Sequence, residues 1–87
     1  MPQTEHEPQA WRKDLDKMRD DLEGMADDLR VRIHLAGMDA KDAWNKLEPR
    51  VYDFQQRAES AVQKTSDELK DVAQDLKARM KRLRDSL

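Results

Sequence analysis

Apolar residues recur along almost the whole chain at alternating steps of three and four, and this spacing decides what the chain can fold into. Residues three and four apart share one face of an α-helix, so the pattern predicts long amphipathic helices. The row, called the seam below, continues past Pro49, and its two halves mirror each other about that residue. Its members are Trp11, Leu15, Met18, Leu22, Met25, Leu29, Ile33, Ala36, Ala40, Trp44, Leu47, Val51, Phe54, Ala58, Val62, Thr65, Leu69, Ala73, Leu76, Met80, Leu83 and Leu87.

Composition supports helices and limits the core. Asp, Glu, Lys and Arg make up 41% of the 87 residues, which leaves too little apolar material for a large core. Two glycines, three prolines and few β-branched residues favour helices over a sheet. The chain has no cysteine for a disulfide and no apolar run as long as a signal-peptide core or a membrane span. We therefore expect an all-α, cytoplasmic protein.

Pro49 is the strongest candidate for a turn, because a proline inside a helix costs about 3 kcal/mol. The mirrored seam and this proline favour an antiparallel two-helix coiled-coil hairpin that self-associates. Its helices would span about residues 10–47 and 50–86, within a helical domain of residues 10–87. The first nine residues contain Pro2 and Pro8 and no apolar pattern, so we predict a flexible tail over residues 1–9.

Two other folds fit the same seam. A single long kinked helix in an oligomer is possible because the seam keeps its phase across Pro49. A three-helix bundle would turn at Gly37, which precedes Asp39, and at Thr65, which forms a capping-box pattern with Glu68. We rank the hairpin first, the kinked helix second and the bundle last, because the bundle places Pro49 inside its middle helix.

Charge is divided between two segments. Residues 14–28 carry seven acids and two bases, whereas residues 70–84 carry six bases and two acids. In heptad notation Asp14, Asp21 and Asp28 occupy g positions, whereas Lys70, Lys77 and Arg84 occupy e positions. Antiparallel helices pair g with g and e with e, so in one hairpin these rows lie on opposite edges. They would meet between two hairpins packed side by side, or they are solvated, and we favour the solvated interpretation because exposed pairs contribute only about 0–1 kcal/mol.

The basic run Lys77, Arg79, Lys81, Arg82 and Arg84 is the best candidate for binding a polyanion, since cations neutralise phosphates. An acidic segment is available to cover this run, and no aromatic residue interleaves it for base stacking. The net charge of -2 gives no general attraction to nucleic acid or to an anionic membrane. Neither partner is favoured, and binding through this run is kept as an alternative function.

The sequence contains no catalytic or metal-binding motif. His6 and His34 are its only histidines, and it has neither a zinc-binding HExxH pattern nor a glycine-rich phosphate loop. We expect no enzymatic activity, no cofactor, no metal and no small-molecule substrate.

A second apolar stripe suggests protein binding. Val31, Leu35 and Met38 are spaced i, i+4, i+7 and would lie opposite the seam on one continuous helix. Tyr52 is an aromatic residue near Pro49 that lies off the seam, so it is a candidate docking residue. We therefore predict a helical interaction or scaffold module that acts by coiled-coil self-association or by binding another helical protein. A structural spacer rod is a further alternative.

Overall fold

Three α-helices form the fold. The computed structural model describes the backbone of residues 2–87 and the side chains of residues 10–87. The helices are α1 (Pro2–Ile33), α2 (Met38–Glu59) and α3 (Gln63–Asp85), and this described part contains no strand, which confirms the all-α prediction. The predicted flexible tail, residues 1–9, lies outside the residues with described side chains and stays a prediction. None of the three helices is long and apolar enough to cross a membrane.

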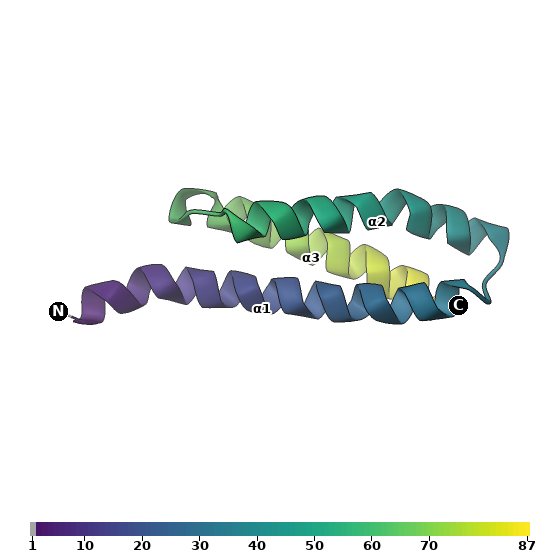
Figure 1. The fold of residues 1–87 in the computed structure, drawn as a ribbon, viewed down its shortest axis with the longest axis horizontal. Coiled ribbons are helices and arrows are strands. Elements are labelled where there is room, and N and C mark those ends of the chain that lie inside the picture. Colours follow the sequence, from purple (N-terminus) through teal and green to yellow (C-terminus); the bar gives the residue numbers. More distant parts are fainter. Residues whose placement is uncertain (1) are drawn as a thin grey trace.

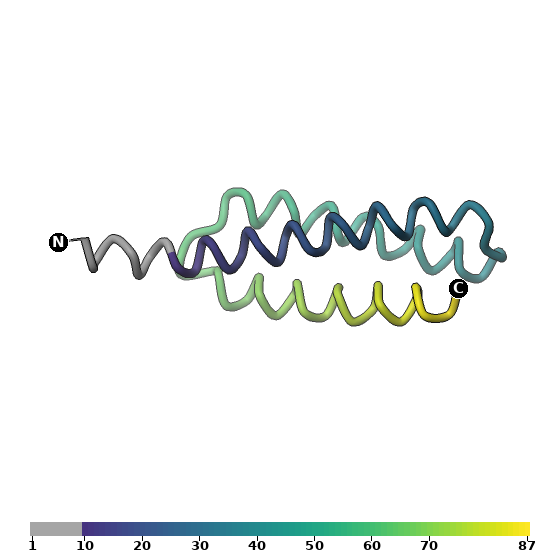
Figure 2. Tube along the Cα trace, turned by 90° about the horizontal axis from the view of Figure 1, so that it is seen from below, coloured from purple at the N-terminus to yellow at the C-terminus, as the bar shows by residue number. Residues whose placement is uncertain are grey.

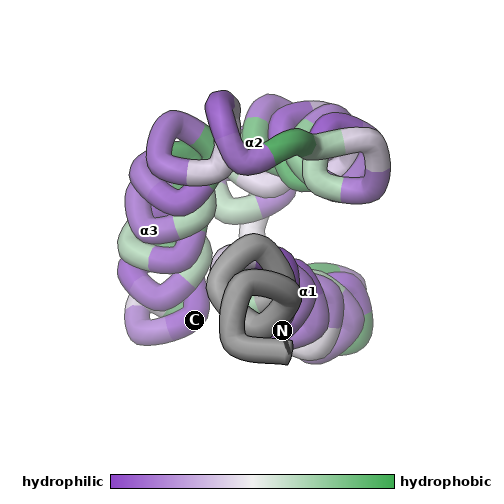
Figure 3. Tube along the Cα trace, turned by 90° about the vertical axis from the view of Figure 1, so that its left-hand side faces the viewer, coloured by the Kyte–Doolittle hydropathy of each residue, from purple (hydrophilic) through white to green (hydrophobic). Residues whose placement is uncertain are grey.

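The helices pack side by side into an elongated bundle. Its extents are 55 × 16 × 16 Å. α1 and α3 run in the same direction, and α2 runs back in the opposite direction (Figures 1 and 2). The view along the bundle shows the three helices arranged around a common axis (Figure 3). The architecture is therefore the three-helix bundle, and neither the two-helix hairpin nor the kinked helix is the fold.

The predicted turn at Pro49 is wrong, because α2 continues through this residue. Pro49 is exposed, so the carbonyl of Asn45, which loses its helical partner, faces the solvent side of the helix. The proline costs about 3 kcal/mol, whereas each large apolar side chain that is buried contributes about 1.5–3 kcal/mol. Trp44, Leu47, Val51 and Phe54 are all buried on the opposite face of α2. Tertiary burial on both sides of Pro49 therefore outweighs its local cost.

The first turn joins α1 to α2 through residues 34–37. Leu35 and Ala36 donate backbone hydrogen bonds of 3.1 Å to the carbonyls of Arg32 and Ile33, which ends α1. Gly37 is the N-cap of α2, not the C-cap of α1, with φ -74° and ψ 174°, and no side chain caps the helix there. The turn predicted near Gly37 is present, but glycine's access to positive φ is not used.

Arg30 ties α1 to α2 near this turn. Its Nε donates to Glu48 of α2 at 2.7 Å, and its Nη1 lies 2.8 Å from Asp27. The hydrogen bond to Glu48 raises the pKa of Arg30 above its ordinary value, although partial burial opposes the shift. A raised arginine pKa contributes stability at every pH below that value, so this guanidinium adds no pH dependence in the neutral range.

The second turn, between α2 and α3, is closed by Arg12 from α1. One guanidinium nitrogen donates to the carbonyl of Ala58 at 2.7 Å and the other donates to that of Ala61 at 2.8 Å. Ala58 lies in the last turn of α2, where helical partners run out, and Ala61 lies in the turn that follows. The guanidinium also lies 5.0 Å from the centre of the Trp11 ring. Arg12 thus joins the start of the bundle to its second turn.

Helix α3 begins three residues before the position that the capping-box pattern indicated. Val62 is the N-cap, and Thr65 is the third residue of the helix. The Thr65 hydroxyl accepts from the Val62 backbone N–H at 3.3 Å. Valine has no acceptor with which to reciprocate, so only half of a capping box is formed. The predicted turn lies near Thr65, but this residue stabilises the helix from inside its first turn.

The seam supplies most of the core of the bundle. All three helices contribute, and Ala26, Ala61 and Ser66 are buried in addition to seam residues. Val62, Thr65 and Leu87 belong to the seam but are exposed, because they lie at the second turn and at the chain end. The fully or nearly fully buried seam residues are Leu15, Leu22, Leu29, Trp44, Leu47, Val51, Phe54, Ala58, Leu69, Ala73, Leu76 and Met80.

The charged rows face each other because α1 and α3 are parallel neighbours. Parallel helices pair g positions with e positions across their interface. Asp14 and Lys70 form such a pair at 3.7 Å, and Asp21 and Lys77 line one hollow between the two helices. The interpretation of these rows as solvated is therefore wrong for Asp14 and Lys70, although their exposure keeps the energy of the pair within about 0–1 kcal/mol.

Candidate functional site

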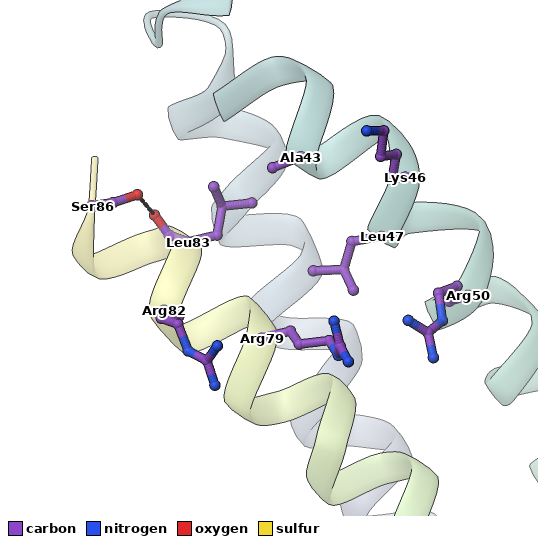
Figure 4. Close-up of a pocket in the computed structure, with 8 residues that line it drawn as sticks. All are labelled: Ala43, Lys46, Leu47, Arg50, Arg79, Arg82, Leu83 and Ser86. Carbon is purple, nitrogen blue, oxygen red and sulfur yellow. Dashed lines mark hydrogen bonds between the residues drawn. The ribbon is translucent and has the colours of Figure 1, made fainter. Parts of the chain in front are cut away.

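A groove lies between α2 and α3. It has a volume of about 500 Å³ and opens to solvent. In Figure 4, Leu47 and Leu83 point into the space between the two helices, beside the small side chain of Ala43. This feature is called the α2–α3 groove below, and its surface is mostly apolar. The lining residues are Ala43, Lys46, Leu47, Arg50, Arg79, Arg82, Leu83 and Ser86.

The groove exists because heptad packing points only one face of each helix at the bundle axis. Leu47 is buried and Leu83 is half-buried, and both lie where the core meets the surface. Their neighbours one turn away on the solvent side, Ala43 and Ser86, are small. The Ser86 hydroxyl is turned back onto its own helix, where it donates to the carbonyl of Leu83 at 2.7 Å. No long side chain therefore fills the space between α2 and α3.

Four cations line the rims of the groove, and no carboxylate does. Lys46 and Arg50 come from α2, whereas Arg79 and Arg82 come from α3. Arg50 and Arg79 extend toward each other across the opening, with Lys46 and Arg82 at the outer edges (Figure 4). Asp75 lies beside the groove, 2.9 Å from Arg79 and 3.9 Å from Arg50. One carboxylate against four cations leaves the groove basic.

The groove continues toward the first turn. A second hollow of about 470 Å³ shares Ala43, Leu83 and Ser86 with it. This hollow reaches Leu35 and Leu87, and Asp39 is the one charged side chain in its lining. A ligand in the α2–α3 groove would thus meet cations at one end and apolar side chains at the other.

The structure divides the predicted polyanion run between two faces of α3. Arg79 and Arg82 line the α2–α3 groove, whereas Lys77 lines the hollow between α1 and α3. Lys81 is exposed, and Arg84 lies 3.9 Å from Asp85. The run is therefore not one continuous basic patch.

The predicted apolar stripe does not lie on one helix, because α1 ends before Leu35 and α2 begins at Met38. All three residues are nevertheless exposed, Val31 by 71%, Leu35 by 93% and Met38 by 74%. Val31 lies near the end of α1, Leu35 lies in the first turn, and Met38 opens α2. Only Leu35 lines the groove system.

Tyr52 lies away from the α2–α3 groove. Its side chain is 62% exposed and lines a shallow hollow between α1 and α2. Arg19 and Glu23 of α1 share that hollow. Tyr52 is therefore not brought together with Leu35 or with the basic run.

Sequence reasoning missed Lys46 and Arg50 as members of a site. Both residues flank the seam residue Leu47, just as Arg79 and Arg82 flank Met80 and Leu83. The heptad phase of the sequence indicates on which side of the helix Lys46 and Arg50 lie. It does not indicate that they face Arg79 and Arg82, because that requires α2 and α3 to be neighbours, which follows from the turn at residues 60–62.

Comparison with known proteins does not add a function. A scan of the sequence against protein-family models finds no match, and searches of curated proteins and of solved structures find none either.

Proposed function

We propose that this protein is a non-enzymatic helical interaction module that binds a partner helix in the α2–α3 groove. The observation that carries the proposal is the mostly apolar groove of about 500 Å³ between two neighbouring antiparallel helices. A helix is the natural occupant, because ridges of side chains from a fourth helix would fill a groove between two others. A cytoplasmic location and the lack of enzymatic activity belong to the same proposal.

The test uses an uncharged amphipathic peptide of about sixteen residues, with leucines spaced i, i+4, i+7 and i+11. Binding is followed by the methyl chemical shifts of Leu47 and Leu83. We expect saturable shifts at both residues. Ala43→Trp should abolish them, because Ala43 is exposed in the groove and a large ring there fills it.

Ala78→Trp is the matched control, because it places the same ring on an exposed position of α3 outside the groove lining. This variant should bind the peptide as the parent does. Shifts that are absent at millimolar peptide, or that Ala43→Trp leaves unchanged, would reject the groove as a helix-binding site.

Self-association is a second candidate, favoured by the exposure of Val31, Leu35 and Met38 around the first turn. Exposed apolar clusters at one end of a molecule are typical of contact surfaces. Leu35→Lys should leave the helical content unchanged, since Leu35 lies outside the core, and should reduce the mass measured by light scattering. An unchanged mass would remove the first turn as a subunit contact.

Two further functions compatible with a small helical protein have less support. A structural spacer rod makes no use of the groove. The case for binding nucleic acid or an anionic membrane is weaker because residues 77–84 are divided between two faces of α3.

A further inference from the structure

The rim of the α2–α3 groove carries more positive charge than the bundle itself neutralises. Asp75 forms ion pairs with Arg79 and Arg50. Lys46 and Arg82 have no ion-pair partner within 4.0 Å among residues 10–87. Cations concentrated beside a concave apolar surface repel one another and raise the local concentration of anionic ligands. The overall charge of -2 makes this basic site a local exception.

The cations are spaced to match a helix. Lys46 and Arg50 are four residues apart on one rim, and Arg79 and Arg82 are three apart on the other. Both intervals correspond to about one helical turn, or roughly 4.5–6 Å along the axis. Carboxylates at i and i+3 or i+4 on the two edges of a docked helix would therefore lie beside cations on both rims.

We propose, on the basis of the helix-binding function above, that the partner is an acidic amphipathic helix whose apolar stripe lies on Leu47 and Leu83 and whose carboxylates face Lys46, Arg50, Arg79 and Arg82. Charge complementarity of this kind selects among partners more than it adds raw affinity. The apolar contact holds the helix, and the rims decide which helices are accepted.

The two ends of the groove define the partner further. From Asp39 to Arg50 the lining follows about eleven residues of α2, which is roughly 17 Å or three turns of a docked helix. The cations lie at one end, whereas Leu35, Leu87 and Asp39 lie at the other. The acidic residues of the partner should therefore be concentrated in two adjacent turns, with apolar residues continuing beyond them.

Other anionic partners fit this site less well. A DNA duplex is read by protein elements that protrude into its grooves, whereas the apolar lining of this site is concave. Single strands bind through aromatic stacking, and the groove lining contains no aromatic residue. An anionic bilayer is flat on this scale and would contact the rims without filling the groove.

The test compares two peptides that share one leucine stripe and differ only in the flanking residues, which are Glu in one and Lys in the other. We expect the Glu-flanked peptide to bind at least about tenfold more tightly at low salt, because four rim contacts change sign. Its binding should weaken several-fold between about 0.05 and 0.5 M NaCl, since exposed charges are screened. The uncharged peptide should be intermediate and insensitive to salt.

Charge reversal of two rim cations then removes the preference. The double variant Lys46→Glu/Arg82→Glu breaks no ion pair within 4.0 Å among residues 10–87. Because Arg50 and Arg79 then face two glutamates, this variant should bind the Glu-flanked and Lys-flanked peptides about equally. The control Lys13→Glu/Lys64→Glu changes the net charge equally at exposed positions outside the groove. This control should keep the preference of the parent, and circular dichroism checks that both variants remain helical.

Each outcome separates the two proposals. The acidic partner would be overturned, and helix binding left standing, if the parent protein bound the two charged peptides equally. The same conclusion would follow if the rim and control variants had equal effects. Failure of all three peptides to shift Leu47 and Leu83 at millimolar concentration would overturn both. Tighter binding of a DNA duplex of about two helical turns, or of vesicles rich in phosphatidylserine, than of the Glu-flanked peptide would also overturn the acidic helix as the ligand.

Discussion

The two turns of the bundle differ in what closes them. At the second turn, Arg12 holds the carbonyls of Ala58 and Ala61, both alanines are buried, and Thr65 reaches back to the N-cap of α3. At the first turn no side chain caps α2, and Leu35 is 93% exposed. The second turn is thus held by the chain's own side chains and leaves Val62 56% exposed, whereas the first turn leaves Val31, Leu35 and Met38 exposed by 71–93%.

This difference indicates that one end of the bundle contributes mainly to stability and the other mainly to binding. The end that contains Arg12 is closed by intramolecular contacts, so mutations there should mainly change stability. The other end contains the α2–α3 groove and the hollow that reaches Leu35, so mutations of exposed lining residues there should mainly change binding. Substitutions at five positions test the comparison, beginning with the largest expected effect.

Phe54 and Leu83 compare the two ends directly. Phe54 is 1% exposed, and Phe54→Ala should lower the free energy of unfolding by about 3–5 kcal/mol through the lost burial and the cavity that remains. Leu83 is half-buried beside the groove, so Leu83→Ala should cost less than about 2 kcal/mol. Urea denaturation followed by circular dichroism measures both values. Equal losses would show that the two ends are closed alike.

Pro49 lies in α2 between the two ends, and its replacement tests how α2 is held. Pro49→Ala restores a helical hydrogen bond at an exposed position and should raise the free energy of unfolding by about 1–3 kcal/mol. The lost rigidity of the unfolded chain offsets part of this gain. A destabilised Pro49→Ala variant in the same urea titration would indicate that the proline shapes the fold.

Pro49 also shows why local rules ranked the turns wrongly: the signals at Gly37 and Thr65 indicated both turns, but the local cost of Pro49 placed the bundle last. The penalty of about 3 kcal/mol follows from the sequence, but the burial that outweighs it depends on helices that are distant in the chain. The seam positions before and after residue 49 mirror each other because two heptad repeats can match in phase by chance. The seam itself predicted most of the core, since it depends only on helical periodicity.

One sequence feature did distinguish the bundle from the hairpin. Acidic g positions and basic e positions pair only between parallel helices, and Asp14 and Lys70 pair in this way between α1 and α3. Parallel neighbours need an intervening helix, which the hairpin lacks. Half of the cations of the candidate site, Arg79 and Arg82, could be found as part of a basic run. The α2 cations belong to the site only because the second turn brings α2 beside α3.

Substitutions of Arg12 measure how much this residue contributes to closing the second turn. Arg12→Leu removes the hydrogen bonds to the carbonyls of Ala58 and Ala61 and the 3.3 Å ion pair with Asp16. It should cost about 1–3 kcal/mol, reduced by the partial exposure of the guanidinium. Lys13→Leu is the matched control at an exposed neighbour and should have little effect. Arg12→Lys keeps the charge but cannot reach both carbonyls with a planar fork, so it should lie between these two. Thermal unfolding that leaves Arg12→Leu equal to its control would remove the clamp as the closing element.

The smallest effect is expected at Gly37, where the open end lacks the side-chain cap that helices usually have. Its dihedral angles are extended, as at most N-caps, and an added Cβ would meet nothing within 4 Å. Gly37→Ser should therefore gain a hydroxyl bond to a first-turn N–H and lose unfolded-state entropy, which together stabilise by about 0.5–1 kcal/mol. Gly37→Ala has only the entropic part, so the difference between the two variants in urea titrations measures the missing cap. A serine variant no more stable than the alanine variant would show that the turn is capped in some other way and that the two ends differ less than their side chains indicate.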